Sequence, residues 1–129
     1  MHHSRLGVIV IDCKTQDLSD ALAFWKGALG LAGKVDDDGK YAVLTTQEGQ
    51  VRVLLQAVDH ESRVHLDIET DDKDAERDRL IALGAREVAA IKQWIVMEAP
   101  TGHRFCLVNP QRSDFPEGAA RWPADQKEA

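Results

Sequence analysis

The strongest constraint on this chain is a pattern of residues that occurs twice along it. The first copy begins with the strand-like segment 8–12, continues through an acidic helix start at 17–20 and closes on Ala28-Leu29-Gly30. The second copy begins at 64–68 and closes in the same way, on Ala82-Leu83-Gly84. Each copy is typical of a strand, a helix and several short strands, and neither can bury its own sheet face alone. The pattern therefore predicts that the copies pair and leave a concave, ligand-binding surface between them.

The helix and turn signals predict where each element lies. In the first copy Asp17 is a good helix N-cap and Gly30 a good left-handed C-cap. In the second copy the helix runs from about Asp72 to Leu83. The predicted strands lie near 6–13, 32–36, 40–46 and 51–57 in the first copy and near 63–69, 86–90, 93–98 and 104–108 in the second.

This pattern predicts one domain over residues 1–129. Its first repeat unit covers about 6–58 and its second about 63–109. A C-terminal tail follows over about 110–129, rich in Pro, Gly, Ala and charge, and it is expected to be loose apart from anchoring contacts at Phe115 and Trp122.

Composition excludes several classes of function. A net charge of −6 and a pI near 5.3 argue against a nucleic-acid partner, which rewards basic patches. No apolar run approaches the roughly 20 residues that cross a bilayer, and the start of the chain lacks a signal-peptide pattern. Two cysteines are too few for a disulfide scaffold, so a reducing compartment is expected. We therefore expect a cytoplasmic protein with no membrane partner.

Three stretches carry a resemblance to a known family. They are Ala21-Leu22-Ala23-Phe24-Trp25 leading to Leu29-Gly30, then Val64-His65-Leu66-Asp67, and Pro100-Thr101-Gly102-His103-Arg104-Phe105-Cys106-Leu107. With the repeated units, they resemble the vicinal oxygen chelate superfamily, and within it the glyoxalase-like and bleomycin-resistance-protein-like proteins. The resemblance implies an α+β fold in which two tandem βαβββ units form a curved, half-barrel-like mixed sheet with a central cavity. It also implies a homodimer.

The resemblance further implies four metal-ligand positions, two in each half. Here they fall on Val8 (or Val10), on Gln56, on His65 and on Cys106. An aliphatic side chain cannot ligate a metal, and a thiol is a poor ligand for a hard cation. We therefore expect no metal cofactor, and we expect His65 and Gln56 to be the ligands if a divalent metal is present.

One strand carries the residues on which catalysis would depend. Arg63, His65, Asp67 and Glu69 alternate with apolar residues, so they share one face of the strand. A solvated face with ion pairs explains this alternation, and so does a face turned into a ligand cavity, as the resemblance implies. In the second case Asp67 would fix the tautomer of His65, and the two are the candidate acid–base pair.

The remaining candidates are residues for binding a ligand. Cys106 is explained either as a buried structural cysteine or as a thiolate activated by His65. Trp94 either packs in the core or forms a wall of the cavity. The full set of candidate ligand-binding residues is His65, Gln56, Cys106, Trp94, Tyr41 and Arg63.

Three functions are compatible with these residues. The first is binding of a small apolar or aromatic molecule between the repeats without a metal, which the missing ligand at Val8 favours. The second is a divergent lyase, isomerase or dioxygenase that uses His65, with or without a divalent metal. The third is a structural or regulatory interaction module with a vestigial cavity. A fold alone does not decide among them.

Overall fold

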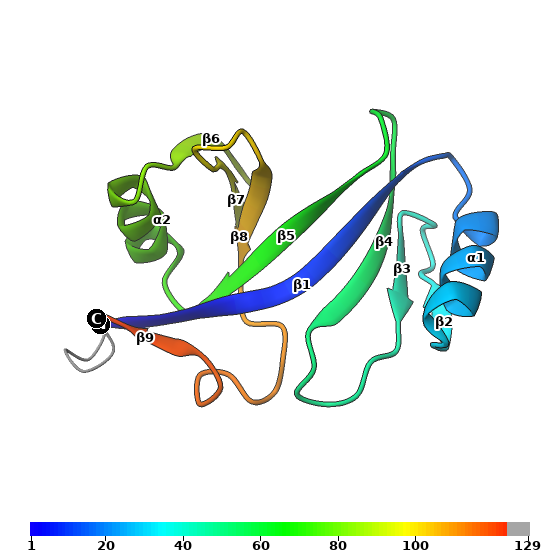
Figure 1. Ribbon diagram of the computed structural model, residues 1–129, viewed down its shortest axis with the longest axis horizontal. Coiled ribbons are helices and arrows are strands. Elements are labelled where there is room, and N and C mark those ends of the chain that lie inside the picture. Colours follow the sequence, from blue (N-terminus) through cyan, green and yellow to red (C-terminus); the bar gives the residue numbers. More distant parts are fainter. Residues whose placement is uncertain (124–129) are drawn as a thin grey trace. The chain divides into compact units, whose positions relative to one another are not determined.

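The computed structural model describes residues 1–123 as two helices and nine strands. The element order is strand–helix–three strands, given twice, followed by one short strand (Figure 1). The elements are β1 (His2–Lys14), α1 (Ser19–Leu29), β2 (Gly33–Val35), β3 (Tyr41–Leu44), β4 (Arg52–Val58), β5 (Arg63–Thr70), α2 (Lys73–Ala82), β6 (Arg86–Ile91), β7 (Trp94–Glu98), β8 (Arg104–Val108) and β9 (Ala120–Trp122). Neither helix is long and apolar enough to cross a membrane.

The first compact unit comprises Val8–His65. Its strands pair in the order β2–β3–β4–β1, with β1 parallel to β4 and the other pairs antiparallel. Helix α1 packs beside this sheet, and its Leu22 joins Leu44 and Leu55 in an apolar core. Gly30 ends α1 in the left-handed conformation at φ 67°, as the sequence predicts.

The second compact unit comprises Met1–Gly7 together with the chain from Leu66 onward. Its strands repeat the pairing order of the first unit, because β6–β7–β8–β5 corresponds to β2–β3–β4–β1. Strand β5 is parallel to β8, as β1 is to β4. A smaller apolar core forms around Ile95, Met97 and Leu107, and α2 packs on strands β6, β7 and β8. The duplication read from the sequence is therefore present in the strand topology.

Polar and charged side chains fill much of the rest of the second unit. Glu69 and Glu76 are completely buried, and His2 and Ser4 are also buried. Glu76 accepts a hydrogen bond from Arg79 at 2.7 Å and contacts His2 Nε2 at 2.8 Å. Glu69 accepts from Arg5 at 3.2 Å and from Arg112 at 3.4 Å. The buried carboxylates are thus each paired with cationic or imidazole groups, as burial of a charge requires.

Three details differ from the sequence expectations. Strand β1 starts at His2, because residues 2–4 pair with β9 and so extend the strand. The N-cap of α1 is Leu18; Asp17 lies one residue earlier and accepts a hydrogen bond from the Ser19 backbone N–H at 2.9 Å. The segment after β8 is not loose as far as residue 123.

Contacts to β1 and α2 hold that segment in place. Trp122 donates to Ser4 Oγ at 2.9 Å, and the Arg79 guanidinium lies 3.9 Å from the centre of the Trp122 ring. Phe115 contacts Arg5, with 5.7 Å between the guanidinium carbon and the ring centre. The predicted anchors Phe115 and Trp122 are confirmed, and the rest of the tail prediction, over 124–129, lies outside the described residues.

Candidate functional site

The candidate site lies on the first unit, at the carboxyl ends of the parallel strands β1 and β4. Asp12 on β1 is the register partner of Gln56 on β4, and Gln56 is in turn the partner of Tyr41 on β3. Register partners stand side by side on one face of a sheet. On β1 this face carries Val8, Val10 and Asp12, since alternate residues share a face. The sequence therefore places two buried valines and then a carboxylate along one line.

His65 on β5 completes the polar group through Asp12. Its Nδ1 lies 2.8 Å from Asp12 Oδ2, the distance of a charge-assisted hydrogen bond. The Asp12 side chain is 3% exposed and that of His65 is 15% exposed. A ring nitrogen next to a carboxylate carries the proton, so this contact holds the imidazole in one tautomer and orientation.

Two further contacts surround this pair. Arg63 Nε lies 3.8 Å from Asp12 Oδ2, which gives the buried carboxylate a nearby positive charge. On the other side of Asp12, the Gln56 amide donates to the Tyr41 hydroxyl at 3.2 Å. Four of the predicted site residues, namely Tyr41, Gln56, Arg63 and His65, therefore gather around one carboxylate.

An open groove of about 760 Å³ adjoins Gln56. Its other lining residues come from the ends of β1 and β4 and from the loops that follow them: Lys14, Thr15, Gln16, Ala57, Val58, Asp59 and His60. This volume lies within the range of small-molecule sites. The wall combines an apolar part, at Ala57 and Val58, with polar donors and acceptors.

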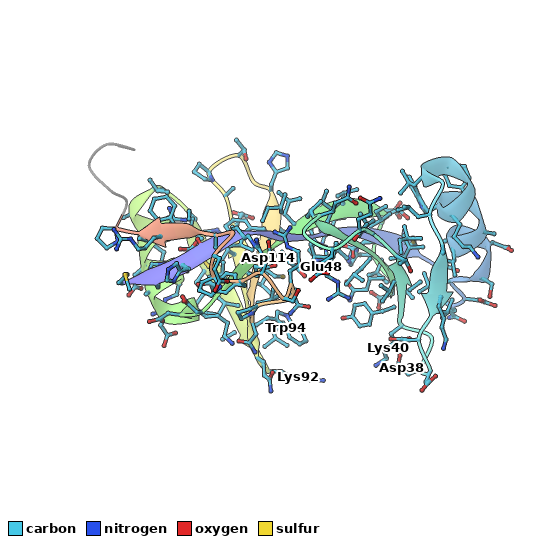
Figure 2. All side chains as sticks on the ribbon, turned by 90° about the horizontal axis from the view of Figure 1, so that it is seen from below. Asp38, Lys40, Glu48, Lys92, Trp94 and Asp114 are labelled. Carbon is cyan, nitrogen blue, oxygen red and sulfur yellow. The ribbon has the colours of Figure 1, made fainter. Side chains whose placement is uncertain are left out.

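The other predicted residues lie in the second unit. Asp67 and Cys106 are register partners on β5 and β8, and both are half-buried. Cys106 on β8 is the register partner of Val96 on β7. Trp94 lies two residues before Val96 on the same strand, so Trp94 and Cys106 share one face of the sheet. Trp94 also lines a separate groove of about 300 Å³ with Lys92, which lies at the tip of the β6–β7 hairpin (Figure 2).

Asp12 was not predicted from the sequence. The predicted carboxylate partner of His65 was Asp67, two residues along the same strand, whereas the hydrogen bond joins His65 to Asp12 on the neighbouring strand. A signal was present, because Asp12 is the one acid that follows the aliphatic run 8–11 on a strand with a buried face. Burial, and then the charge of Asp12, raise the pKa of the neighbouring Cys13 thiol, so this cysteine is not activated as a nucleophile.

The four family metal positions do not form a complete ligand set here. Val8 is buried and aliphatic, so the first-strand position supplies no ligand atom. Cys106 offers a thiol at the fourth position, which is a poor ligand for a hard cation. A hard cation such as Mn²⁺ prefers an oxygen-rich set, so these residues do not fit it.

Comparison with known proteins identifies a family. The model described as the glyoxalase-like domain matches residues 8–108, which is most of the chain. No curated protein matches the chain.

Solved structures with the same fold come from several bacteria. A hypothetical protein from Bacillus halodurans superposes with a TM-score of 0.59 at 12% identity, over 85% of this chain and 96% of that chain. An Mn(II)-bound glyoxalase from Novosphingobium aromaticivorans gives 0.57 at 22% identity, over 93% of this chain and 44% of that chain. A structure described as an NAD-dependent benzaldehyde dehydrogenase from Legionella pneumophila gives 0.58 at 12% identity, over 81% and 98%. At these identities the likeness shows the fold, and the predicted α+β class is confirmed.

Proposed function

The chain belongs to the glyoxalase-like domain family, and on that premise we propose that it binds a small organic molecule in the first unit, across strands β4 and β1 and the first residues of β5, up to His65. The observation that carries this proposal is the clustering of Gln56, Asp12 and His65 on three neighbouring strands, with Gln56 lining a groove. Binding pockets combine a few oriented polar groups with an apolar wall, and this arrangement supplies both.

The spacing of these strands sets the size of the ligand. Gln56 and His65 lie on either side of β1, so their backbones are separated by two strand spacings, roughly 10 Å. A single-ring aromatic compound with one polar substituent spans such a distance. The polar substituent would meet the Gln56 amide or His65, and the ring would rest on Tyr41 or on the apolar wall at Ala57 and Val58.

The donor chemistry supports binding without a metal. The first-strand position is Val8, whose aliphatic side chain supplies no ligand atom. We therefore expect a chelator to leave the affinity for the organic ligand unchanged. We also expect Mn²⁺ to leave the melting temperature of the protein unchanged within about 1 °C, since a metal ion that does not bind cannot stabilise the fold.

The test is a ligand-observed NMR screen with aromatic aldehydes, carboxylic acids and phenols, followed by calorimetric titration of the strongest compound. We expect one molecule per chain and the same affinity with and without EDTA. Gln56→Ala is expected to weaken binding about tenfold, the upper value for one lost hydrogen bond.

The matched control is Gln47→Ala, which removes an exposed glutamine of the same unit and is expected to leave the affinity unchanged. Equal effects of the two variants would contradict the proposed position of the ligand. The absence of any binding compound would favour an interaction module, and affinity lost in EDTA and restored by a metal would favour a metal-dependent enzyme.

A further inference from the structure

We propose that the groove between α2 and the β6–β7 hairpin of the second unit binds an aromatic carboxylate, with the ring against Trp94 and the carboxylate at Lys92. The volume of this groove is about 300 Å³, at the small end of the range for small-molecule sites. Its lining residues all lie between Asp72 and Ile95, within one compact unit. The groove therefore shares no lining residue with the one beside Gln56, and the proposal goes beyond the function proposed for that groove.

Trp94 forms the apolar wall of this groove together with Ala90 and Ile95 (Figure 2). The Trp94 side chain is half-buried, and its indole N–H donates to no acceptor within residues 1–123. A tryptophan removed from water usually has such an acceptor, as Trp122 has in Ser4 Oγ at 2.9 Å. A ring bound against Trp94 would bury apolar area of both partners, and the indole N–H is available to an anionic oxygen of the ligand.

The three carboxylates that line the groove are each engaged by the protein itself. Asp74 accepts a hydrogen bond from Arg77 at 3.2 Å, and Glu87 lies 3.8 Å from the same guanidinium. Asp72 is the N-cap of α2 and accepts from the backbone N–H of Ala75 at 3.0 Å. One cation and one helix end therefore account for the negative charges of the groove.

The two lysines of the groove have no carboxylate of their own. Lys73 donates to the neutral amide oxygen of Asn109 at 2.6 Å. Within residues 1–123, no carboxylate oxygen lies within 4.0 Å of the ammonium nitrogen of Lys73 or of Lys92. Hydrogen bonds between an ammonium group and a carboxylate are among the stronger ones in proteins. A ligand that joins a planar ring to a carboxylate therefore matches both the apolar wall and the uncompensated positive charge.

The backbone of Lys92 supports a role for its side chain. Ile91 on β6 is the register partner of Trp94 on β7, so Lys92 and Gln93 form a two-residue turn. Lys92 is the one non-glycine residue with positive φ within residues 1–123, at 52°. This conformation costs free energy for a lysine, and turns of this length favour Gly or Asn at such positions. The turn itself would thus be better served by glycine, and residues held in this way are frequent at ligand-binding positions.

The first test is an NMR titration with 2-naphthoate, read at the indole N–H of Trp94. This signal is assigned by its loss in Trp94→Phe. We expect it to move and to saturate with a Kd of about 1 mM, as for other ligands of this size, while the Trp122 signal stays in place. 2-Naphthamide has the same rings without the charge and is expected to bind at least about fivefold more weakly. An unmoved Trp94 signal, or equal binding of the two compounds, would overturn the proposal.

Lys92→Gly separates the binding role of this lysine from a structural one. The variant is expected to weaken 2-naphthoate binding about fivefold, because the ammonium group is lost. Its melting temperature is expected to be unchanged or higher, because glycine adopts a φ of 52° without cost. The matched control is Lys40→Gly in the β2–β3 hairpin, the counterpart of β6–β7 in the first unit, and it is expected to leave the affinity unchanged (Figure 2).

Further outcomes separate this site from the one proposed in the first unit. Gln56→Ala is expected to leave the Trp94 response to 2-naphthoate unchanged, because Gln56 does not line this groove. Loss of the response in Gln56→Ala, or equal affinity of Lys92→Gly and wild type, would overturn the second site. Weaker binding together with a lower melting temperature in Lys92→Gly would assign that lysine a structural role instead. A Trp94 response that weakens in Lys92→Gly and persists in Gln56→Ala supports the site, whatever the aromatic screen shows for the first unit.

Discussion

Strands β1 to β4 and strands β5 to β8 pair in the same order, yet the interiors of the two units have different chemistry. The first unit buries aliphatic side chains beneath α1, among them Leu18, Leu44 and Leu55. The second unit has a smaller aliphatic cluster and buries two glutamates with their cationic partners. One topology is thus compatible with an apolar interior and with an ionic one.

The origin of the difference lies in α2. The buried residue of α1 is Leu22, whereas the buried residue of α2 is Glu76. A helix with few apolar residues cannot stabilise a sheet by hydrophobic burial alone. In the second unit, hydrogen bonds from His2 and Arg79 and the contact of Arg79 with Trp122 supply the remaining contacts. The second unit is therefore stabilised by residues near the start of the chain and by Trp122, while the first is stabilised by its own helix.

The largest expected effect comes from removing the central carboxylate of the second unit. Glu76→Ala leaves Arg79 and His2 without their buried partner, and breaking a buried ion pair in this way costs about 3–5 kcal/mol. Urea denaturation measures the free energy of unfolding. Glu117→Ala, an exposed site of the same unit, is the control and is expected to change it by less than about 0.5 kcal/mol. A small effect of Glu76→Ala would show that the ionic interior is not what stabilises this unit.

The corresponding change in the first unit removes a buried leucine. Leu55→Ala leaves a cavity beneath α1 and is expected to cost about 2–5 kcal/mol. Unlike the loss from Glu76→Ala, this loss is expected to be the same at pH 7 and at about pH 3.5, because no ionisable group is removed. Urea denaturation at the two pH values makes the comparison, with the half-exposed Leu29→Ala as control. Equal pH dependence of the two variants would contradict the contrast between the units.

A smaller effect is expected from a methyl group added to β1. A Cβ at Gly7 would lie 2.5 Å from Glu69 Oε2, so Gly7→Ala displaces the buried carboxylate and is expected to cost about 1–3 kcal/mol. Gly27→Ala on α1 has open space around its Cβ and is expected to stabilise by about 0.4–1 kcal/mol. Thermal melting distinguishes the two signs. The same sign for both would mean that the packing around Glu69 tolerates a side chain at residue 7.

The smallest expected effect is the change in the stability contribution of Glu76 as the pH is lowered from neutral. Burial alone would raise the pKa of Glu76, but hydrogen bonds from Arg79, His2 and Ser4 lower it further than burial raises it. A carboxyl whose pKa is lower in the folded state stabilises the fold above its ordinary value of 4.5 and loses this contribution as pH falls through the folded-state pKa. We expect the stability difference between wild type and Glu76→Gln to be constant from pH 7 to about 5 and to shrink below about 4.5. A difference that grows on acidification would contradict this sign.

Much of the fold was predictable because it depends on local patterns. Alternation and helical spacing located ten of the elements, and the repeated Ala-Leu-Gly endings indicated the duplication that the strand pairing confirms. Strand β9 was missed because its sequence, Ala120-Arg121-Trp122, has no alternation and is held by pairing with residues 2–4.

The residues of the candidate site were predictable only where their polar side chains follow a pattern within one strand or one turn. The predicted residues Tyr41, Gln56, Arg63 and His65 do lie together in the first unit. The partner of His65 was not predictable, because Asp12 is distant in sequence and is brought to it by the pairing of β1 with its neighbours. The sequence also gave no reason to expect His2 to be buried on Glu76. The homodimer and the cytoplasmic location stay predictions.

Strand β1 has a consequence for any attempt to divide this protein. Residues 2–7 belong to one compact unit and residues 8–14 to the other, within a single unbroken strand. A cut in the linker between the repeats, near residue 60, would therefore separate the second half from His2, His3 and Arg5, the partners of Glu76, Asp71 and Glu69. The repeats look like modules in the sequence, but the chain as folded has no boundary at which both halves keep all their own contacts. Fragments made at that point are expected to be useful only as a complementing pair.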